Sequence, residues 1–356
     1  MDNFEKLKEM KTLHEFETYA LDESLSGHGK LYFSAGACSK STPRYNEDAF
    51  HKYRIRPRVL RDVSEPKIDC KVLNSSVSCP IGISPVGLQV LAHQDAESAT
   101  AKGCCKEKCV FILSSSASQS IEEVANEAQS LEGIHPVLWM QTYIHKDRSI
   151  TLDIIKKAES SGFSAIVVTV DSPNGGLWRK MLPDDFFKRV PSLLAILHSL
   201  PRNLEDPSVT FEDLKWVIEN SKLPVIAKGI LSGEDARRVV ECGISAIIVS
   251  NHGSRLLERV VPTIDVLKEV VDAVSETGTE VYLDGGVRSG SDVFISLALG
   301  AKAVFIGRPA IWGLSLGGEN GVRKILQILK DELFMTMQVA GVRHIEDIQR
   351  SMIIRT

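Results

Sequence analysis

A histidine and an arginine lie three residues apart in Ser250-Asn251-His252-Gly253-Ser254-Arg255, directly after a short apolar run. An imidazole accepts and returns protons near neutral pH, so His252 is suited to act as a general base. The guanidinium group of Arg255 can bind a carboxylate through two parallel hydrogen bonds. Asp171 ends another apolar run and is suited to stabilise a histidine cation by charge pairing. These residue types predict proton removal from a substrate that carries a carboxylate.

Two segments that combine glycine with arginine predict a phosphate site. They are Asp284-Gly285-Gly286-Val287-Arg288-Ser289-Gly290 and Ile306-Gly307-Arg308-Pro309. Glycines let backbone N–H groups approach phosphate oxygens closely, and guanidinium groups pair with those oxygens. Lys228, at the end of a further apolar run, could supply positive charge to a cofactor. These residues alone do not distinguish a flavin mononucleotide from a sugar phosphate or pyridoxal phosphate.

The candidate residues follow short apolar, β-branched runs that recur along the chain. The runs are Pro80–Pro85, Cys109–Ser114, Val137–Tyr143, Ala165–Asp171, Pro224–Gly229, Ala246–Asn251, Val281–Gly285 and Ala303–Arg308. Continuous apolar runs are typical of parallel strands that are buried on both faces. Helix-period stretches lie between them, one of which starts with the capping-box spacing Ser120-Ile121-Glu122-Glu123.

This alternation predicts an α/β fold, a (β/α)₈ TIM barrel over about residues 80–340, within a single domain spanning residues 1–356. The first eighty residues are expected to cover the bottom and one side of the barrel. A long insertion, about residues 172–222, follows the fourth strand and predicts a partly irregular lid. Because the active site of such a barrel lies at the carboxyl ends of its strands, the polar residues there should surround one pocket.

Composition excludes several classes of partner. The 356 residues include 42 Lys+Arg and 46 Asp+Glu, a net charge of −4, which does not favour nucleic acid or an anionic membrane surface. No apolar run reaches the length of a membrane helix. The N-terminus does not read as a signal peptide, and the final Ile354-Arg355-Thr356 is not an S-K-L-type signal, so an intracellular protein is expected. Cys104, Cys105 and Cys109 are predicted to be buried thiols, with no metal site.

The three motifs around His252, Asp284 and Arg308 together resemble the FMN-dependent 2-hydroxy-acid oxidase family, which includes glycolate oxidases and flavin lactate dehydrogenases. The resemblance runs from Tyr32 to about Ile348. It implies a barrel that carries non-covalent FMN and oxidises (S)-2-hydroxy acids to 2-oxo acids, with oxygen as the expected acceptor and hydrogen peroxide as the product. It also implies a homotetramer and a peroxisomal location, although the terminus leaves the cytosol open.

The resemblance also implies a role for each matching residue. His252 matches the base, Asp171 its carboxylate partner, Arg255 and Tyr32 the groups that hold the substrate carboxylate, and Tyr143 the group that bonds the substrate hydroxyl. The cofactor contacts are expected from Pro85, Val86, Gly87, Ser114, Gln141, Thr169, Lys228, Ser250, Asp284, Gly286, Arg288, Gly307 and Arg308.

The chain departs from the family pattern at three positions. Ser116 stands where small-substrate members usually carry tryptophan, whose loss removes a large wall of the pocket. We therefore expect glycolate to be a poor substrate and medium or long-chain 2-hydroxy acids to be better. A second carboxylate-binding arginine aligns with Trp178, and a one-residue shift would replace it with Arg179. Gly87 stands where the family often has alanine.

Three alternatives stay open at this point. One is a barrel isomerase or dehydrogenase that uses FMN or a sugar phosphate for other chemistry. Another is an FMN-binding hydroxy-acid sensor or weakly active relative, suggested by Ser116 and Trp178. The third is a structural partner in a larger assembly, although the sequence has no coiled-coil heptads that would support it.

Overall fold

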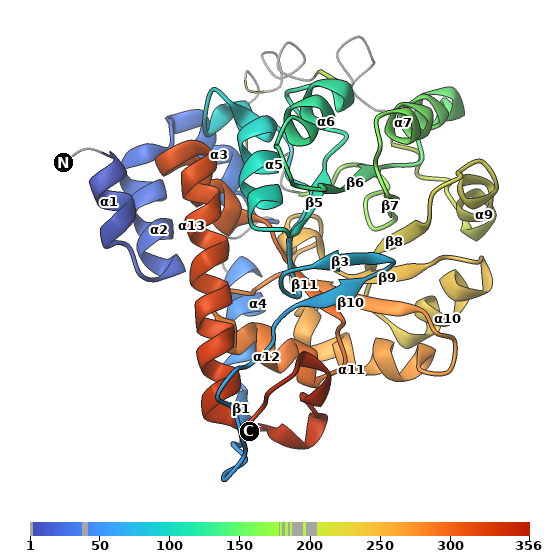
Figure 1. Cartoon of the computed structure of the whole chain (residues 1–356). Helices are drawn as coiled ribbons and strands as arrows, with labels where there is room; N and C mark the ends of the chain where they lie inside the picture. The colour runs from blue at the N-terminus through green and yellow to red at the C-terminus, as the bar shows by residue number, and fades with distance from the viewer. Residues whose placement is uncertain are drawn as a thin grey trace.

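A computed structural model describes residues 3–37, 42–177, 179, 182–183, 186, 195–196 and 205–356. Its centre is a closed barrel of eight parallel strands in chain order (Figure 1). The strands are β4 (Ile81–Ile83), β5 (Val110–Leu113), β6 (Val137–Thr142), β7 (Ala165–Thr169), β8 (Val225–Ile230), β9 (Ala246–Val249), β10 (Glu280–Asp284) and β11 (Ala303–Ile306). β11 pairs with β4 and closes the ring. The predicted TIM barrel is therefore confirmed.

Helices surround the barrel as the β-then-α alternation predicts. They are α5 (Ala96–Lys106), α6 (Ile121–Gln129), α7 (Arg148–Ser160), α9 (Phe211–Glu219), α10 (Gly233–Glu241), α11 (Thr263–Val274), α12 (Gly290–Ala298) and α13 (Arg308–Ala340). The capping box at the start of α6 is present: the Ser120 side chain accepts from the Glu123 N–H, and the Glu123 carboxylate accepts from the Ser120 N–H. The helix start predicted from the Ser120–Glu123 spacing is therefore confirmed.

Large aromatic side chains fill the interior of the barrel. Trp139, Tyr282 and Phe305 are almost completely buried, with ring centroids 5.5–5.7 Å apart. The hairpin of β2 (Cys70–Val72) and β3 (Ser75–Val77) packs against this cluster through Val72 and Val77. Because the interior is packed, the space for a ligand lies at the carboxyl ends of the strands.

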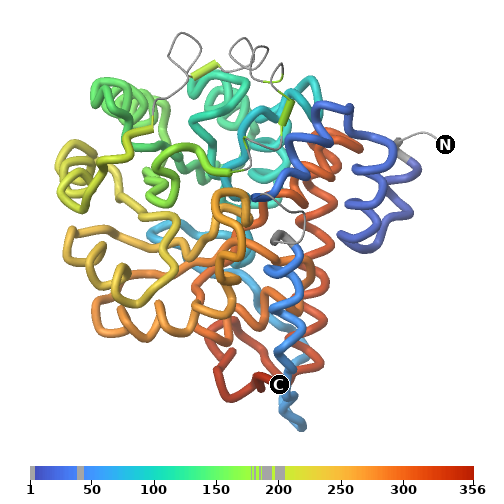
Figure 2. The backbone as a smooth tube through the Cα atoms, turned by 180° about the vertical axis from the view of Figure 1, so that it is seen from behind, coloured from blue at the N-terminus to red at the C-terminus, as the bar shows by residue number. Residues whose placement is uncertain are grey.

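The N-terminal segment reaches both the side and the mouth of the barrel. Its helices are α1 (Asn3–Glu9), α2 (Leu13–Tyr19), η1 (Ala20–Ser24), α3 (Gly27–Ser34) and α4 (Thr42–Phe50). Figures 1 and 2 show α1 and α2 beside the long α13. The end of α3 contacts the barrel mouth, where Arg308 donates to the carbonyl of Phe33 at 3.0 Å. A final strand, β12 (Ile353–Arg355), pairs with β1 (Tyr53–Ile55).

The insertion after β7 is described only in part. α9, the barrel helix of this unit, lies in the last portion of the predicted range of about 172–222. Cys104, Cys105 and Cys109 are buried free thiols, and the described part of the chain holds no cluster of three or more metal-binding side chains. No helix among the described residues is long and apolar enough to cross a membrane.

Candidate active site

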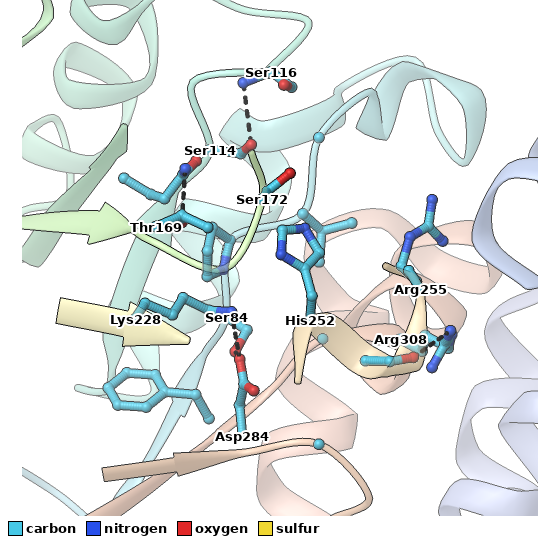
Figure 3. A pocket seen from close by; sticks show the side chains of 18 of the residues that line it. Ser84, Ser114, Ser116, Thr169, Ser172, Lys228, His252, Arg255, Asp284 and Arg308 are labelled. Carbon is cyan, nitrogen blue, oxygen red and sulfur yellow. Dashed lines mark hydrogen bonds and ion pairs between the residues drawn. The ribbon is translucent and has the colours of Figure 1, made fainter. Parts of the chain in front are cut away.

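One cavity opens at the carboxyl ends of the barrel strands, with about 1190 Å³ of empty volume that is partly open to solvent. All the predicted site residues line it except Asp171 and Ser250, which lie directly behind it. Figure 3 shows Lys228, Ser84 and Asp284 on one side of His252, and Arg255 and Arg308 on the other. The sequence-predicted residues therefore come together at one mouth.

The side chains of His252 and Asp171 contact each other in the site. The His252 Nδ1 lies 3.0 Å from the Asp171 Oδ1, and the side chains are 23% and 13% exposed. The second carboxylate oxygen of Asp171 is buried and has no hydrogen-bond partner among the described residues. A carboxylate oxygen at this distance accepts a hydrogen bond from Nδ1, which orients the ring and leaves the lone pair on the other ring nitrogen, Nε2. His252 is thus arranged to accept a proton on its other nitrogen.

The backbone that presents His252 is strained and is held in place by a pair of asparagines. His252, Gly253 and Ser254 all have positive φ angles, of 56°, 63° and 61°. Asn46 and Asn251 exchange two side-chain hydrogen bonds, of 2.9 and 2.8 Å, and Asn251 also accepts from the Ser254 N–H. Such strain persists only where the surroundings over-determine the conformation. Asn46 therefore helps to position His252.

A buried polar network surrounds Lys228. Its ammonium group donates to the Ser250 hydroxyl at 2.8 Å and lies 3.1 Å from the Asp284 Oδ2, which also accepts from Ser84. Ser250 in addition accepts from the His252 N–H. Ser250 thus orients its neighbours and does not line the cavity itself. The other oxygen of Asp284 is buried without a partner in the described residues, as expected for an acceptor that faces a ligand hydroxyl.

Amide and hydroxyl groups line the wall formed by β5, β6 and β7. The Gln141 Nε2 donates to the Thr169 hydroxyl at 3.0 Å, and the Gln141 Oε1 accepts from the Ser115 N–H. The Ser114 hydroxyl accepts from the Ser116 N–H at 3.1 Å. This wall offers donors and acceptors at fixed positions to a heterocyclic ring.

The opposite side of the cavity carries arginines that suit a phosphate. Burial and the neighbouring charges of Arg255 and Arg288 lower the pKa of Arg308 to about 9. Arg288 pairs with Glu47 at 2.8 Å, yet its buried Nε has no hydrogen-bond partner among the described residues. A bound phosphate would compensate this clustered positive charge. Together with the orphaned Asp284 oxygen and the Gln141 wall, the donor set fits FMN.

Arg255 is fixed by the N-terminal segment. Its Nη1 donates to the carbonyls of Tyr32 and Ala35 at 2.8 and 3.2 Å, and its guanidinium carbon lies 5.0 Å from the centre of the Tyr32 ring. Burial lowers the pKa of Arg255. A desolvated guanidinium held in this way attracts a carboxylate strongly.

Ser116 and Gly87 are packed against each other. A Cβ built on Gly87 would lie 2.6 Å from the Ser116 carbonyl oxygen and 2.7 Å from its Cβ. The Leu88 N–H donates to the same carbonyl at 2.9 Å. The two departures from the family pattern are therefore linked, because alanine at position 87 would displace the loop that carries Ser116.

Some residues of the site were not identified from the sequence. Glu205 lines the cavity and lies 2.5 Å from Arg179, and Asn46 supports the His252 loop. Neither residue belongs to a motif or follows a barrel strand, so only the folded chain reveals them. Arg179 does line the cavity, as the one-residue shift predicts, whereas Trp178 lies outside the described residues.

Comparison with known proteins shows the family. The family model for FMN-dependent dehydrogenase matches residues 22–355. The chain is 41% identical over 344 residues to human 2-hydroxyacid oxidase 1, covering 90% of each chain. It is 40% identical over 333 residues to a peroxisomal (S)-2-hydroxyacid oxidase of Arabidopsis thaliana, again covering 90% of each. The chain therefore belongs to the FMN-dependent dehydrogenase family. It is a flavoenzyme with FMN as its cofactor, of the (S)-2-hydroxy-acid oxidase type.

Solved structures agree with this assignment. A doubly substituted flavocytochrome b2 with pyruvate bound superposes with a TM-score of 0.88 at 34% identity, covering 98% of this chain and 87% of that one. A substituted mandelate oxidase with (S)-mandelic acid superposes with a TM-score of 0.85 at 33% identity, covering 96% and 97%. The fold is thus shared with a flavocytochrome b2 and with a mandelate oxidase.

Removal of FMN should destabilise the protein. Because the cofactor binds only the folded chain, FMN at a hundred times its Kd should add about 2.7 kcal/mol to the free energy of unfolding. Urea unfolding of the FMN-free protein, with and without added FMN, measures the difference. In the Arg308→Met variant, the same FMN concentration should add clearly less to the free energy of unfolding. Equal midpoints with and without FMN in the unsubstituted protein would contradict this role of the cavity.

Proposed function

We propose that the protein oxidises (S)-2-hydroxy acids larger than glycolate to 2-oxo acids, with oxygen as the electron acceptor and hydrogen peroxide as the product. The observation that carries the proposal is the His252–Asp171 pair at 3.0 Å, since its imidazole lines the same cavity as Arg255 and Arg179. A base and an anion-binding group on one substrate are what oxidation of a 2-hydroxy acid needs.

The substrate carboxylate binds between Arg255 and Arg179, with the Tyr32 side chain beside it. The Tyr143 hydroxyl donates a hydrogen bond to the substrate hydroxyl. Burial together with the nearby carboxylates of Asp171 and Glu205 raises the pKa of Tyr143, so its hydroxyl stays protonated at neutral pH. These contacts hold the α-carbon of the substrate against the base.

His252 accepts a proton from the substrate, and Asp171 stabilises the cation that results. Bound FMN supplies the acceptor for the two electrons. The positive charge of Lys228 lies beside the wall formed by β5, β6 and β7, and it favours negative charge on a ring bound against that wall. The ion pair with Asp284 and the hydrogen bond to Ser250 keep the ammonium group in position.

Substrate size follows from the wall around Ser116. A serine in place of an indole leaves space for a longer or bulkier side chain, since a buried tryptophan covers about 150–250 Å². The Ala195 N–H donates to the Ala117 carbonyl at 3.1 Å, so the insertion contacts this same loop. The relative that binds (S)-mandelic acid supports a family pocket that accepts a bulky side chain.

The Ser116→Trp variant should shift preference toward small substrates. The indole would occupy the space expected to hold the substrate side chain, so the ratio of kcat/KM for 2-hydroxyoctanoate to that for glycolate should fall about 10- to 100-fold. Steady-state kinetics with both acids measures the ratio. Ser116→Ala is the matched control and should leave the ratio close to that of the unsubstituted protein. An unchanged ratio in Ser116→Trp would show that this position does not limit substrate size.

The oxygen reaction is tested with the same substrate panel. We expect oxygen consumption and an equal amount of hydrogen peroxide when the FMN-loaded protein meets (S)-2-hydroxyoctanoate in air. Turnover only with an artificial electron acceptor would identify a dehydrogenase and reject oxygen as the acceptor. Higher catalytic efficiency with glycolate than with the longer acids would reject the proposed substrate class.

Location and assembly are proposed on the family alone. The peroxisomal relative supports a peroxisomal location for this chain. We further propose a homotetramer, which light scattering of the purified holoenzyme tests directly. A monomeric mass would reject it, and a fluorescent fusion that stays in the cytosol would reject the peroxisome.

A further inference from the structure

A further ion pair, between Arg179 and Glu205, lies in the wall of the substrate cavity. The Arg179 Nη2 is 2.5 Å from the Glu205 Oε1, and both residues line the cavity that holds His252 and Arg255. The side chain of Glu205 is only 13% exposed. On its own, the Glu205 carboxylate would repel an anionic substrate in this cavity.

Glu205 is paired with the loop that follows β6. Its backbone forms an antiparallel bridge with His145, two residues after Tyr143. Arg148 donates to the His145 carbonyl and pairs with Asp206 at 2.9 Å, which ties the neighbouring residue to the start of α7. The Glu205 carboxylate therefore has a fixed position relative to Tyr143 and the substrate hydroxyl.

Arg179, by contrast, belongs to the insertion after β7. The Leu177 N–H donates to the Leu256 carbonyl at 3.0 Å, which brings this part of the insertion beside the His252 loop. The Arg179 guanidinium lies against the α-carbon of Gly175, where a Cβ would overlap it. Gly175, at φ 78°, thus leaves room for the side chain to fold back into the cavity.

The pair also balances charge. Glu205 without Arg179 would place an uncompensated negative charge in the wall of a pocket that binds carboxylates, which would weaken substrate binding. Arg179 without Glu205 would keep its charge and lose the acceptor that fixes its direction. An amide at position 205 can still accept one hydrogen bond from the guanidinium but lacks the negative charge and the second oxygen, so it replaces the carboxylate only in part.

We propose that Glu205 is a positioning residue that directs Arg179 onto the substrate carboxylate, and so restores the carboxylate site despite the one-residue shift of the arginine. This inference rests on the proposed function for the identity of the substrate. It assigns Glu205 a role through Arg179, since Glu205 itself repels the carboxylate.

The test is a double-mutant cycle on the FMN-loaded protein. The probe is 2-oxooctanoate, and its Kd is read from the absorbance of the bound flavin. Glu205→Gln should raise the Kd about fivefold, and Glu205→Asp should recover part of the loss. Arg179→Met should raise the Kd further, because it removes the arginine and exposes the substrate to the Glu205 charge. With 2-hydroxyoctanoate, KM should rise more than kcat falls.

The distinctive result is a reversal of sign. In the Arg179→Met background, Glu205→Gln should lower the Kd, because it then removes only a repulsive charge. A merely structural role for Glu205 would weaken binding in both backgrounds. Glu107→Gln is the matched control, because Glu107 is similarly buried and is paired with Lys330 and Arg323. Glu107 lies outside the cavity, so the Kd of this variant for 2-oxooctanoate should equal that of the unsubstituted protein.

The other outcomes bear either on the role of Glu205 or on the proposed function. An unchanged or lower Kd in Glu205→Gln alone would overturn the proposal, and so would failure of the unsubstituted protein to bind 2-oxooctanoate. Binding without reduction of the flavin by any 2-hydroxy acid would reject the proposed function, while the binding cycle would still test the role of Glu205.

Discussion

Replacement of His252 by alanine should lower the rate of flavin reduction by a 2-hydroxy acid about 10⁴-fold. General base catalysis contributes about 10²–10⁴-fold, and the paired Asp171 places this base at the upper end of that range. FMN should remain bound, because the ring wall of Gln141 and Thr169 and the arginines that suit the phosphate are unchanged. Rapid mixing without oxygen measures the rate, and the flavin-to-protein ratio checks the cofactor content.

Two variants make this result interpretable. Asp171→Asn keeps a hydrogen-bond acceptor but removes the charge, so it should lower the same rate by a smaller factor, about 100-fold. Asn46→Ala should weaken the support of the His252 loop without removing the base. Flavin reduction at a near-normal rate in His252→Ala would show that another group accepts the proton.

Replacement of Arg255 by methionine should lower kcat/KM about 10³-fold. Loss of one partner from a desolvated charge pair costs about 2–5 kcal/mol, and each 1.36 kcal/mol corresponds to a factor of ten. Methionine keeps much of the side-chain volume, so the change tests mainly the charge and its hydrogen bonds. Steady-state kinetics over a wide range of 2-hydroxy acid concentration measures the effect.

Arg255→Lys should recover only part of the loss, because an ammonium group cannot form two parallel bonds to a carboxylate. Arg323→Met is a suitable control, since Arg323 pairs with Glu107 outside the cavity. A change in kcat/KM below threefold for Arg255→Met would mean that the substrate carboxylate binds elsewhere.

The barrel was predictable because its strands are encoded locally. Runs such as Ala165–Asp171 are mainly apolar, and their polar residues lie near the carboxyl end of the strand, at a known place in the fold. Once eight strands are in order, their carboxyl ends meet at one mouth, so Lys228, His252 and Asp284 had to lie near one another. Position along the strand was therefore enough to group them.

The parts that escaped prediction depend on contacts between distant segments. Asn46 and Asn251 are 205 residues apart, and Arg179 and Glu205 meet across an insertion without a regular pattern. Likewise, the need for glycine at position 87 arises from Ser116, which lies in the next βα loop. Hydrophobic periodicity carries no information on such pairs, because it reports which residues are buried and not which residues meet.

Reduction of the bound flavin in the absence of oxygen tests most directly whether the protein oxidises 2-hydroxy acids. The FMN-loaded protein is mixed with (S)-2-hydroxyoctanoate, (S)-mandelate, (S)-lactate and glycolate, and the flavin absorbance is followed. We expect the flavin to bleach, faster with the larger acids than with glycolate, and its absorbance to recover when air is admitted. Absorbance that stays unchanged with every 2-hydroxy acid would contradict this expectation.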